Sequence, residues 1–134
     1  MITEQYVGFL TAQLLKEKGF DVPTKTYYED EESIEEYDLY SPKPINWNNT
    51  AFYAKPSQSL VMRWLREEKH FYIQIMLDSW ALGGHSGYYI VIQDINSEFK
   101  EISPIIDDNP DLVFFETYEQ AAESAIKYCL ENLI

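Results

Sequence analysis

The residues that look most like reactive chemistry form the glycine-rich stretch Gly83-Gly84-His85-Ser86-Gly87. A serine or histidine among glycines is typical of two motifs, the nucleophile elbow and the phosphate-binding loop. The nucleophile elbow needs Gly-x-Ser-x-Gly between a strand and a helix, whereas Ser86 is followed directly by Gly87 and then by a strand-like segment. A phosphate-binding loop needs a lysine or a helix N-terminus after its glycines, and neither follows here. We therefore expect a hairpin loop whose glycines adopt positive φ.

Metal-ligating and nucleophilic side chains are few. The two histidines, His70 and His85, would have to combine with carboxylates such as Asp78, and their spacing matches no zinc motif. The single cysteine, Cys129, has no partner thiol and falls in a helical apolar stripe, which is typical of a buried small hydrophobic residue. No nucleophile, base and orienting group can be named together. We therefore expect a protein that is not an enzyme and that uses no cofactor and no metal.

Acidic residues dominate the charge, and they are unevenly distributed. The formal net charge is −13; residues 1–70 hold 12 acidic and 8 basic side chains, whereas residues 71–134 hold 11 acidic and 2 basic ones. Such a field opposes nucleic-acid backbones and anionic membranes, because binding to them depends on lysine and arginine displacing counterions. We therefore expect direct binding to neither nucleic acid nor membrane.

The densest acidic run lies at residues 29–38, where seven of ten residues are carboxylates. Their mutual repulsion predicts an exposed turn or excursion. The acidity can serve solubility alone, or it can present a surface that competes with nucleic acid for a basic protein. The second hypothesis makes Glu31, Glu32, Glu35 and Glu36 candidate interaction residues.

Aromatic residues make up 16% of the chain, and several fall in loops or at strand positions that cannot all face one core. Trp47, Trp80 and Tyr88 are the aromatic candidates for an exposed contact surface. Three interpretations stay open: ordinary packing at the rim of the sheet, a protein interface, or a pocket for a nucleotide-like small molecule between the sheet and the two tryptophan loops.

Hydrophobic periodicity predicts three helices and about five strands in one domain over residues 1–134. The expected helices are 3–18, 57–69 and 117–134, and the expected strands are 24–29, 37–40, 71–77, 88–92 and 98–102, with a short apolar strand at 112–116 before the last helix. The order α-β-β-α-β-β-β-α predicts an α+β fold, in which an antiparallel sheet of about five strands carries the helices mainly on one face. Strands 71–77 and 88–92 are expected to form a hairpin.

Helix ends are the best-marked local features. Thr3 is the expected N-cap of the first helix, and Gly19 is expected in the left-handed C′ position with Phe20 packed on Leu15. For the last helix, Thr117 with a glutamine three residues later predicts a capping box.

No segment approaches the roughly 20 apolar residues of a membrane span, and the first residues lack the basic and apolar regions of a secretory signal. We therefore expect a cytoplasmic protein.

Three blocks of sequence stand out as a set: residues 14–21 (LLKEKGFD), 56–67 (PSQSLVMRWLRE) and 117–122 (TYEQAA). Together they resemble a family of small uncharacterised proteins encoded in phages, prophages and conjugative elements of gut anaerobes. The resemblance extends over the whole chain but is specific in these blocks only. It implies an accessory role in a mobile element and carries over no catalytic or binding residue.

The first functional hypothesis is a non-enzymatic accessory protein that binds a host or element-encoded protein through exposed aromatics beside an acidic face. The alternatives are an acidic mimic of nucleic acid that antagonises a host DNA- or RNA-binding protein, and a protein that binds or sequesters a small molecule. A homodimer through an exposed strand edge, such as residues 88–92, is a further expectation.

Overall fold

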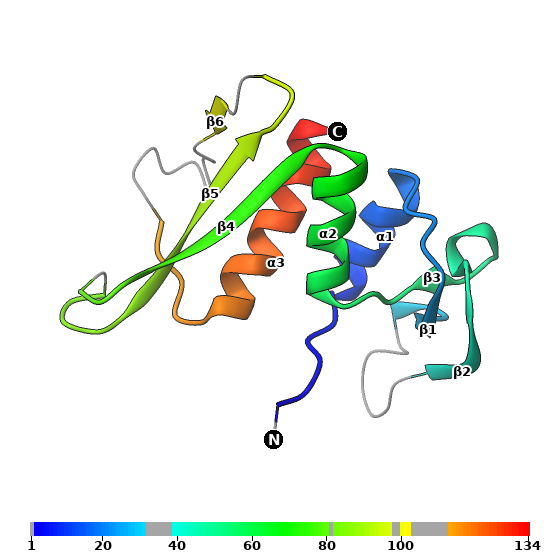
Figure 1. Cartoon of the computed structure of the whole chain (residues 1–134). Coiled ribbons are helices and arrows are strands. Elements are labelled where there is room, and N and C mark those ends of the chain that lie inside the picture. The colour runs from blue at the N-terminus through cyan, green and yellow to red at the C-terminus, as the bar shows by residue number, and fades with distance from the viewer. Residues whose placement is uncertain (1, 32–38, 81, 98–99, 103–112) are drawn as a thin grey trace.

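The computed structural model describes residues 2–31, 39–80, 82–97, 100–102 and 113–134 (Figure 1). Its helices are α1 (Phe9–Glu17), α2 (Gln58–Glu68) and α3 (Tyr118–Tyr128), and α3 continues as a π-helical turn over Cys129–Leu133. Its strands are β1 (Thr24–Tyr28), β2 (Leu39–Ile45), β3 (Tyr53–Ala54), β4 (Phe71–Asp78), β5 (Gly87–Asp94) and β6 (Lys100–Ile102). A short 3₁₀ helix, η2 (Trp47–Asn49), lies between β2 and β3.

The strands form two antiparallel sheets, in the orders β2-β1-β3 and β4-β5-β6. The helices lie between the sheets: α1 contacts β3, whereas α3 contacts β4 and β5, and α2 contacts β4 (Figure 1). The α+β class and the antiparallel pairing are therefore confirmed, but the prediction of a single sheet of about five strands is wrong. A hydrophobic pattern predicts where strands lie but not which strands pair with each other. In this chain, α2 comes between the three strands of one sheet and the three strands of the other.

The two-residue strand β3 has no counterpart among the expected strands. It pairs with β1 through Tyr27↔Ala54 and Tyr28↔Tyr53. Two residues are too few for an alternating pattern to show in a sequence. The observed order is therefore α-β-β-β-α-β-β-β-α.

One hydrophobic core forms where the helices meet both sheets. It takes buried residues from every helix and from β1, β3 and β5, and its largest fully buried members include Leu15, Phe20, Val61, Leu65, Ile92, Ile126 and Leu130. The Phe20 ring also meets the Trp64 ring edge-on, with centroids 5.2 Å apart. Among the described residues, no helix combines the length and apolar character needed to cross a bilayer.

The first helix begins later than expected. Gly8 is its N-cap, so the prediction of Thr3 at that position is wrong. The segment before α1 instead pairs its backbone with the segment that enters α2, where the Val7 N–H donates to the Pro56 carbonyl at 3.0 Å. The backbone N–H and C=O groups of the segment before α1 therefore bond to this neighbouring segment. In a helix that began near Thr3 they would instead have formed intrahelical hydrogen bonds.

The end of α1 follows the prediction. Gly19 has φ +85°, its N–H donates to the Lys16 carbonyl at 3.3 Å, and the Phe20 N–H donates to the Leu15 carbonyl at 3.0 Å. These two bonds define a Schellman ending, and both Phe20 and Leu15 are fully buried.

The predicted capping box of α3 is also confirmed. The Gln120 N–H donates to Thr117 Oγ1 at 3.1 Å, and the Thr117 N–H donates to Gln120 Oε1 at 3.3 Å. The hydroxyl of Ser57 caps α2 by accepting a hydrogen bond from the Leu60 N–H at 3.2 Å.

Replacing Gly19 by alanine should lower the free energy of unfolding by about 1 kcal/mol, because a residue with a Cβ is strained at positive φ. The matched control is Glu17→Ala on the same helix. Glu17 is exposed and helical, so the expected change is below about 0.5 kcal/mol. Urea unfolding followed by circular dichroism measures both, and equal losses would contradict the assigned role of Gly19.

Candidate functional site

The side of the β4–β5 hairpin that faces away from the helices is an uncharged surface on a strongly acidic protein. Alternation along the strands turns Ile73, Ile75, Ile90 and Ile92 toward the core. The six residues on the opposite side pair across the strands as Tyr72↔Gln93, Gln74↔Val91 and Met76↔Tyr89. We call these six residues the outer face, and none of them carries a charged side chain.

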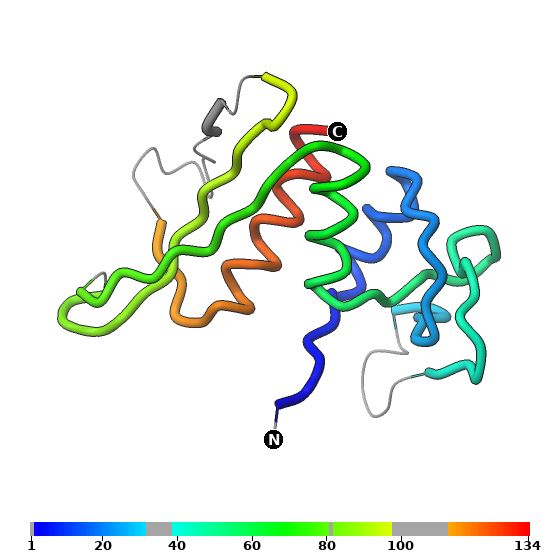
Figure 2. Tube along the Cα trace, in the orientation of Figure 1, coloured from blue at the N-terminus to red at the C-terminus, as the bar shows by residue number. Residues whose placement is uncertain are grey.

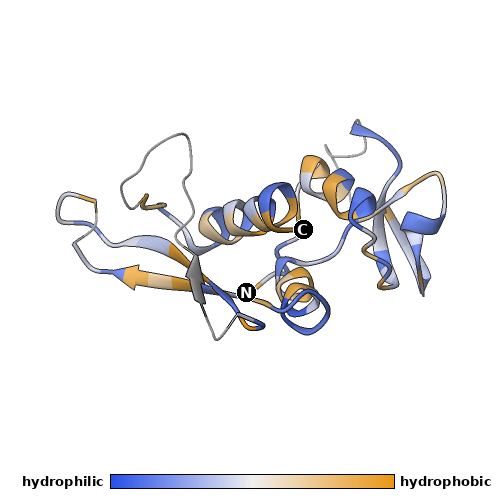
Figure 3. Cartoon of the chain, turned by 90° about the horizontal axis from the view of Figure 1, so that it is seen from above, coloured by the Kyte–Doolittle hydropathy of each residue, from blue (hydrophilic) through white to orange (hydrophobic). Residues whose placement is uncertain are grey.

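Parts of the outer face are open to solvent. Tyr72 is 36% exposed and Met76 is 40% exposed. The Tyr89 ring meets the Phe114 ring edge-on with centroids 5.9 Å apart, so the aromatic surface extends beyond the two strands. The hairpin projects past the helices, and hydrophobic residues continue along it (Figures 2 and 3). Exposed apolar surface of this kind is typical of an interaction site.

Strand β4 lies at the edge of its sheet. All eight of its residues pair with β5, and no strand in the described part of the chain pairs with its other side. Tyr88 exchanges both of its backbone hydrogen bonds with Phe115, so Leu77, its neighbour across the hairpin, points its N–H and C=O away from β5. Backbone directions alternate along a strand, so every second residue of β4 does the same. The open edge is the set of outward N–H and C=O groups of Phe71, Ile73, Ile75 and Leu77.

The tip of the hairpin presents a tryptophan. Trp80 is 77% exposed, and its N–H donates to Asp78 Oδ1 at 2.9 Å, which fixes the start of the turn. Gly83 and Gly84 have φ of +62° and +98°, and the two residues that flank them exchange backbone hydrogen bonds. The prediction of a hairpin loop with positive-φ glycines is confirmed.

The acidic candidates fall largely outside the described residues. Glu31 is described and exposed, whereas Glu32, Glu35 and Glu36 lie outside the described residues. The hypothesis that this run imitates nucleic acid therefore stays a prediction.

Trp47 belongs to the framework of the first sheet. Its indole N–H donates to the Thr24 carbonyl at 2.8 Å, and its ring stacks on Tyr27 with centroids 3.9 Å apart. The helix η2 that carries it lies beside β3, at the opposite end of the molecule from the β4–β5 tip that carries Trp80 (Figure 1). The structure does not bring the two tryptophans together, so it gives no pocket between their loops.

Tyr88 faces the helices. Its ring meets the ring of Tyr118, the first residue of α3, edge-on with centroids 6.1 Å apart. The strand that carries it, β5, pairs with β4 on one side and meets Phe115 and β6 on the other. The expectation of an exposed edge at residues 88–92 is therefore wrong, because β4 takes the edge of this sheet and β5 the middle.

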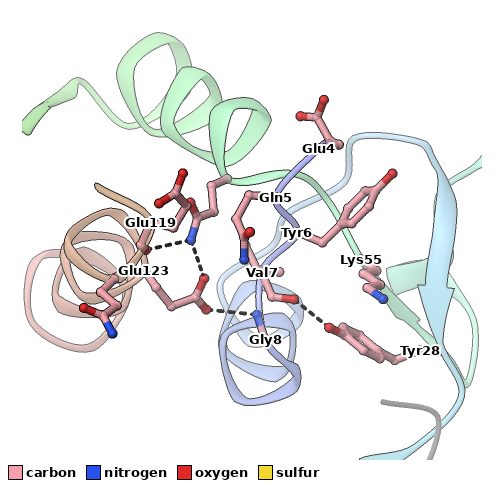
Figure 4. Close-up of a pocket in the computed structure, with 11 residues that line it drawn as sticks. Glu4, Gln5, Tyr6, Val7, Gly8, Tyr28, Lys55, Glu119 and Glu123 are labelled. Carbon is pink, nitrogen blue, oxygen red and sulfur yellow. Dashed lines mark hydrogen bonds between the residues drawn. The ribbon is translucent and has the colours of Figure 1, made fainter. Parts of the chain in front are cut away.

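A groove of about 510 Å³ lies between the segment before α1, the first turns of α3 and Lys55 (Figure 4). Its central polar groups bond to one another. Glu123 Oε2 accepts hydrogen bonds from the Gly8 N–H at 3.0 Å and from Thr11 Oγ1, and Glu123 Oε1 accepts from Gln58 Nε2 at 3.0 Å. The carboxylate also meets the positive end of α1. This side of the groove is a junction between the three helices.

Lys55 closes the other side of the groove. It is only 8% exposed, and its Nζ lies 4.9 Å from the centre of the Tyr28 ring and 5.4 Å from that of Tyr6. The Tyr28 hydroxyl donates to the Val7 carbonyl at 2.6 Å. These cation–π contacts and this hydrogen bond attach β1 to the segment before α1. The groove therefore serves the packing of the fold.

Reactive side chains do not gather elsewhere in the described part of the chain. No three His, Cys, Asp or Glu side chains there could jointly hold a metal ion. Cys129 is fully buried, and burial raises the pKa of its thiol to about 12. The thiol is thus protonated at neutral pH, and the prediction of a buried hydrophobic residue is confirmed.

Sequence reasoning missed Glu123, Lys55 and the open edge. The donors that meet Glu123 lie between 65 and 115 positions away in the sequence, so no local pattern could reveal them. A signal for the edge was present, because residues 71–77 contain no charged side chain in a chain with a net charge of −13.

Comparison with known protein families, curated proteins and solved structures gives no significant match for this chain.

Replacing Glu123 by alanine should lower the free energy of unfolding by about 2 kcal/mol, because it leaves the donors of three residues without their charged acceptor. The matched control on the same helix is Glu119→Ala, which removes an exposed carboxylate and should cost less than about 0.5 kcal/mol. Thermal and urea unfolding report both changes. Similar losses in the two variants would show that Glu123 does not hold the helices together.

The native protein should resist thiol reagents at mildly alkaline pH, because the Cys129 thiol is buried and its pKa is raised to about 12. Denaturant should expose the thiol and allow complete labelling within minutes. A maleimide-labelling time course followed by mass spectrometry checks this. Rapid labelling of the native chain would contradict the burial of Cys129.

Proposed function

We propose that this chain is a non-enzymatic binding protein that associates with another protein through the β4–β5 hairpin. The observation that carries the proposal is the combination of an uncharged outer face, an open edge and a largely exposed Trp80 on one element. Tyrosine, tryptophan and methionine are enriched in protein interfaces, and charged residues are depleted at their centres. The hairpin has this composition.

The exposed apolar side chains of the hairpin can contribute binding energy to an association. Met76 on the outer face is 40% exposed, Leu77 on the opposite side of β4 is 58% exposed, and Trp80 at the tip is 77% exposed. Burial of one large apolar side chain contributes about 1.5–3 kcal/mol, and a few such anchors carry most of the binding energy of an interface. The open edge adds backbone hydrogen bonds that a partner strand can complete.

The acidic remainder of the chain supports a role in choosing partners. A net charge of −13 repels other acidic proteins and nucleic acid, and it accelerates encounter with a protein whose rim is basic. The resemblance to proteins of phages and mobile elements supports placing this binding activity in an accessory factor of such an element.

The other two hypotheses receive less support. The mimicry hypothesis depends on residues 29–38, most of which lie outside the described residues, together with the carboxylates of residues 71–134. The small-molecule hypothesis depends on a pocket between two tryptophans, and these lie at opposite ends of the molecule (Figure 1).

The proposal predicts that Leu77→Lys and Trp80→Ser each weaken recovery of a partner protein from a lysate of the producing cell by about tenfold, since each removes an exposed apolar side chain that the partner would cover. The matched control is Leu10→Lys on α1, where the leucine is 66% exposed. Affinity capture with quantitative mass spectrometry is the measurement. Capture should persist at high salt, because the surface is uncharged.

Two results would count against binding through the hairpin. One is recovery of nothing above background at both low and high salt by a chain that also does not associate with itself. The other is a partner that the hairpin variants recover as well as the unaltered chain does. A partner that is lost only at high salt would instead favour the acidic run, by charge screening.

A further inference from the structure

We propose that the protein pairs with a second copy of itself, with the β4 strands of the two copies antiparallel along their open edges. This inference rests on the proposed function, because it names the partner for the same surface. The product is one continuous antiparallel sheet that joins the β4-β5-β6 sheets of both copies across a twofold axis.

Residues 71–77 lack the sequence features that commonly prevent such pairing. Edge strands are commonly protected by lysine, proline, an inward-pointing charge or a β-bulge. Residues 71–77 contain none of these residue types, and their register with β5 runs without interruption. The edge is therefore a long, regular row of outward N–H and C=O groups. A strand of another chain can pair with such an edge.

Twofold symmetry and the largest number of hydrogen bonds together select one register. Only residues with outward N–H and C=O groups can exchange hydrogen bonds across the new interface. Full use of the open edge pairs Phe71 with Leu77 of the partner subunit and Ile73 with Ile75 of the partner subunit. The axis then passes through Gln74, whose own N–H and C=O point toward β5. Gln74 faces its symmetry mate at a non-hydrogen-bonded position, where the two side-chain amides can bond to each other.

The same register matches charges and side-chain types. Asp78 of the partner subunit comes next to the residues that precede β4, among which Lys69 is basic, so an acidic and a basic residue lie near each other at both ends of the interface. Tyr72 comes opposite Met76 of the partner subunit, a favourable sulfur–aromatic pair. No charge lies between these ends, so the net charge of −13 on each copy stays outside the contact. Parallel pairing would instead place like groups side by side.

Oxidative crosslinking tests the register directly. Opposed residues at a non-hydrogen-bonded antiparallel position have Cβ atoms about 4.5–5.5 Å apart, close to the separation that a disulfide spans. The variant Gln74→Cys should therefore give a disulfide-linked dimer under mild oxidation. The matched control is Gln93→Cys, on the outer face of the central strand β5, which should give none. Cys129 does not compete, because it is buried.

Charged substitutions at Gln74, next to the twofold axis, provide an independent test through the dissociation constant of the dimer in solution. Gln74→Lys and Gln74→Glu each place like charges opposite each other, so each should raise the dimer dissociation constant about threefold to fivefold. An equimolar mixture of the two variants should form the mixed dimer with the affinity restored. Gln93→Lys should leave the constant unchanged. Sedimentation equilibrium over a range of protein concentrations measures all four.

The possible outcomes separate this inference from the proposed function. A chain that stays monomeric at every concentration, or Gln74→Cys that crosslinks no better than Gln93→Cys, overturns the self-pairing. If a monomeric chain still recovers a lysate protein that Leu77→Lys loses, the hairpin binds a different protein and the proposed function holds. Rescue in the mixed pair together with the Gln74→Cys dimer establishes the antiparallel self-pairing.

Discussion

The carboxylate of Glu123 is the contact on which the arrangement of the helices depends. It belongs to α3, yet it accepts hydrogen bonds from the start of α1 and from the first residue of α2. A helix N-terminus leaves N–H groups unsatisfied and carries a partial positive charge, so a carboxylate from a neighbouring helix satisfies both requirements at once. α1 has no capping side chain of its own. The position of Glu123, together with the backbone pairing of the segment before α1, therefore accounts for a helix that begins at Phe9 instead of near Thr3.

The three joined helices lie between the two sheets, and the two sheets differ in how their aromatic residues are placed. At the other end of α1, Lys16 Nζ donates to the carbonyls of Thr50 and Phe52 at 2.7 and 2.8 Å, which attaches the segment between η2 and β3. Several aromatic residues of this first sheet pack against one another, as the stack of Trp47 on Tyr27 shows, whereas Tyr40 is 62% exposed. In the described part of the second sheet only one face meets the helices, and on the other face Tyr72 is 36% exposed.

Features that a few neighbouring residues determine could be read from the sequence, and features set by distant partners could not. The Schellman ending at Gly19 and the capping box at Thr117 each involve residues within one or two turns, as does the loop of the β4–β5 hairpin. The division into two sheets and the start of α1 depend on backbone pairing between segments far apart in sequence. The candidate site shows the same limit: the residue type alone suggested both Trp47 and Trp80, but only their partners in space distinguish a packed ring from an exposed one.

An uncharged edge has a particular meaning in a chain this acidic. Solubility alone would favour charge at the exposed positions of an edge strand, and acidic residues are abundant elsewhere in the sequence. Residues 71–77 instead hold none, while Lys69 and Asp78 flank them with opposite signs. General repulsion between acidic copies disfavours contact in most orientations, and the antiparallel β4 pairing is an orientation in which the nearest charges attract. The same charge distribution that keeps the chain dispersed therefore makes its association selective.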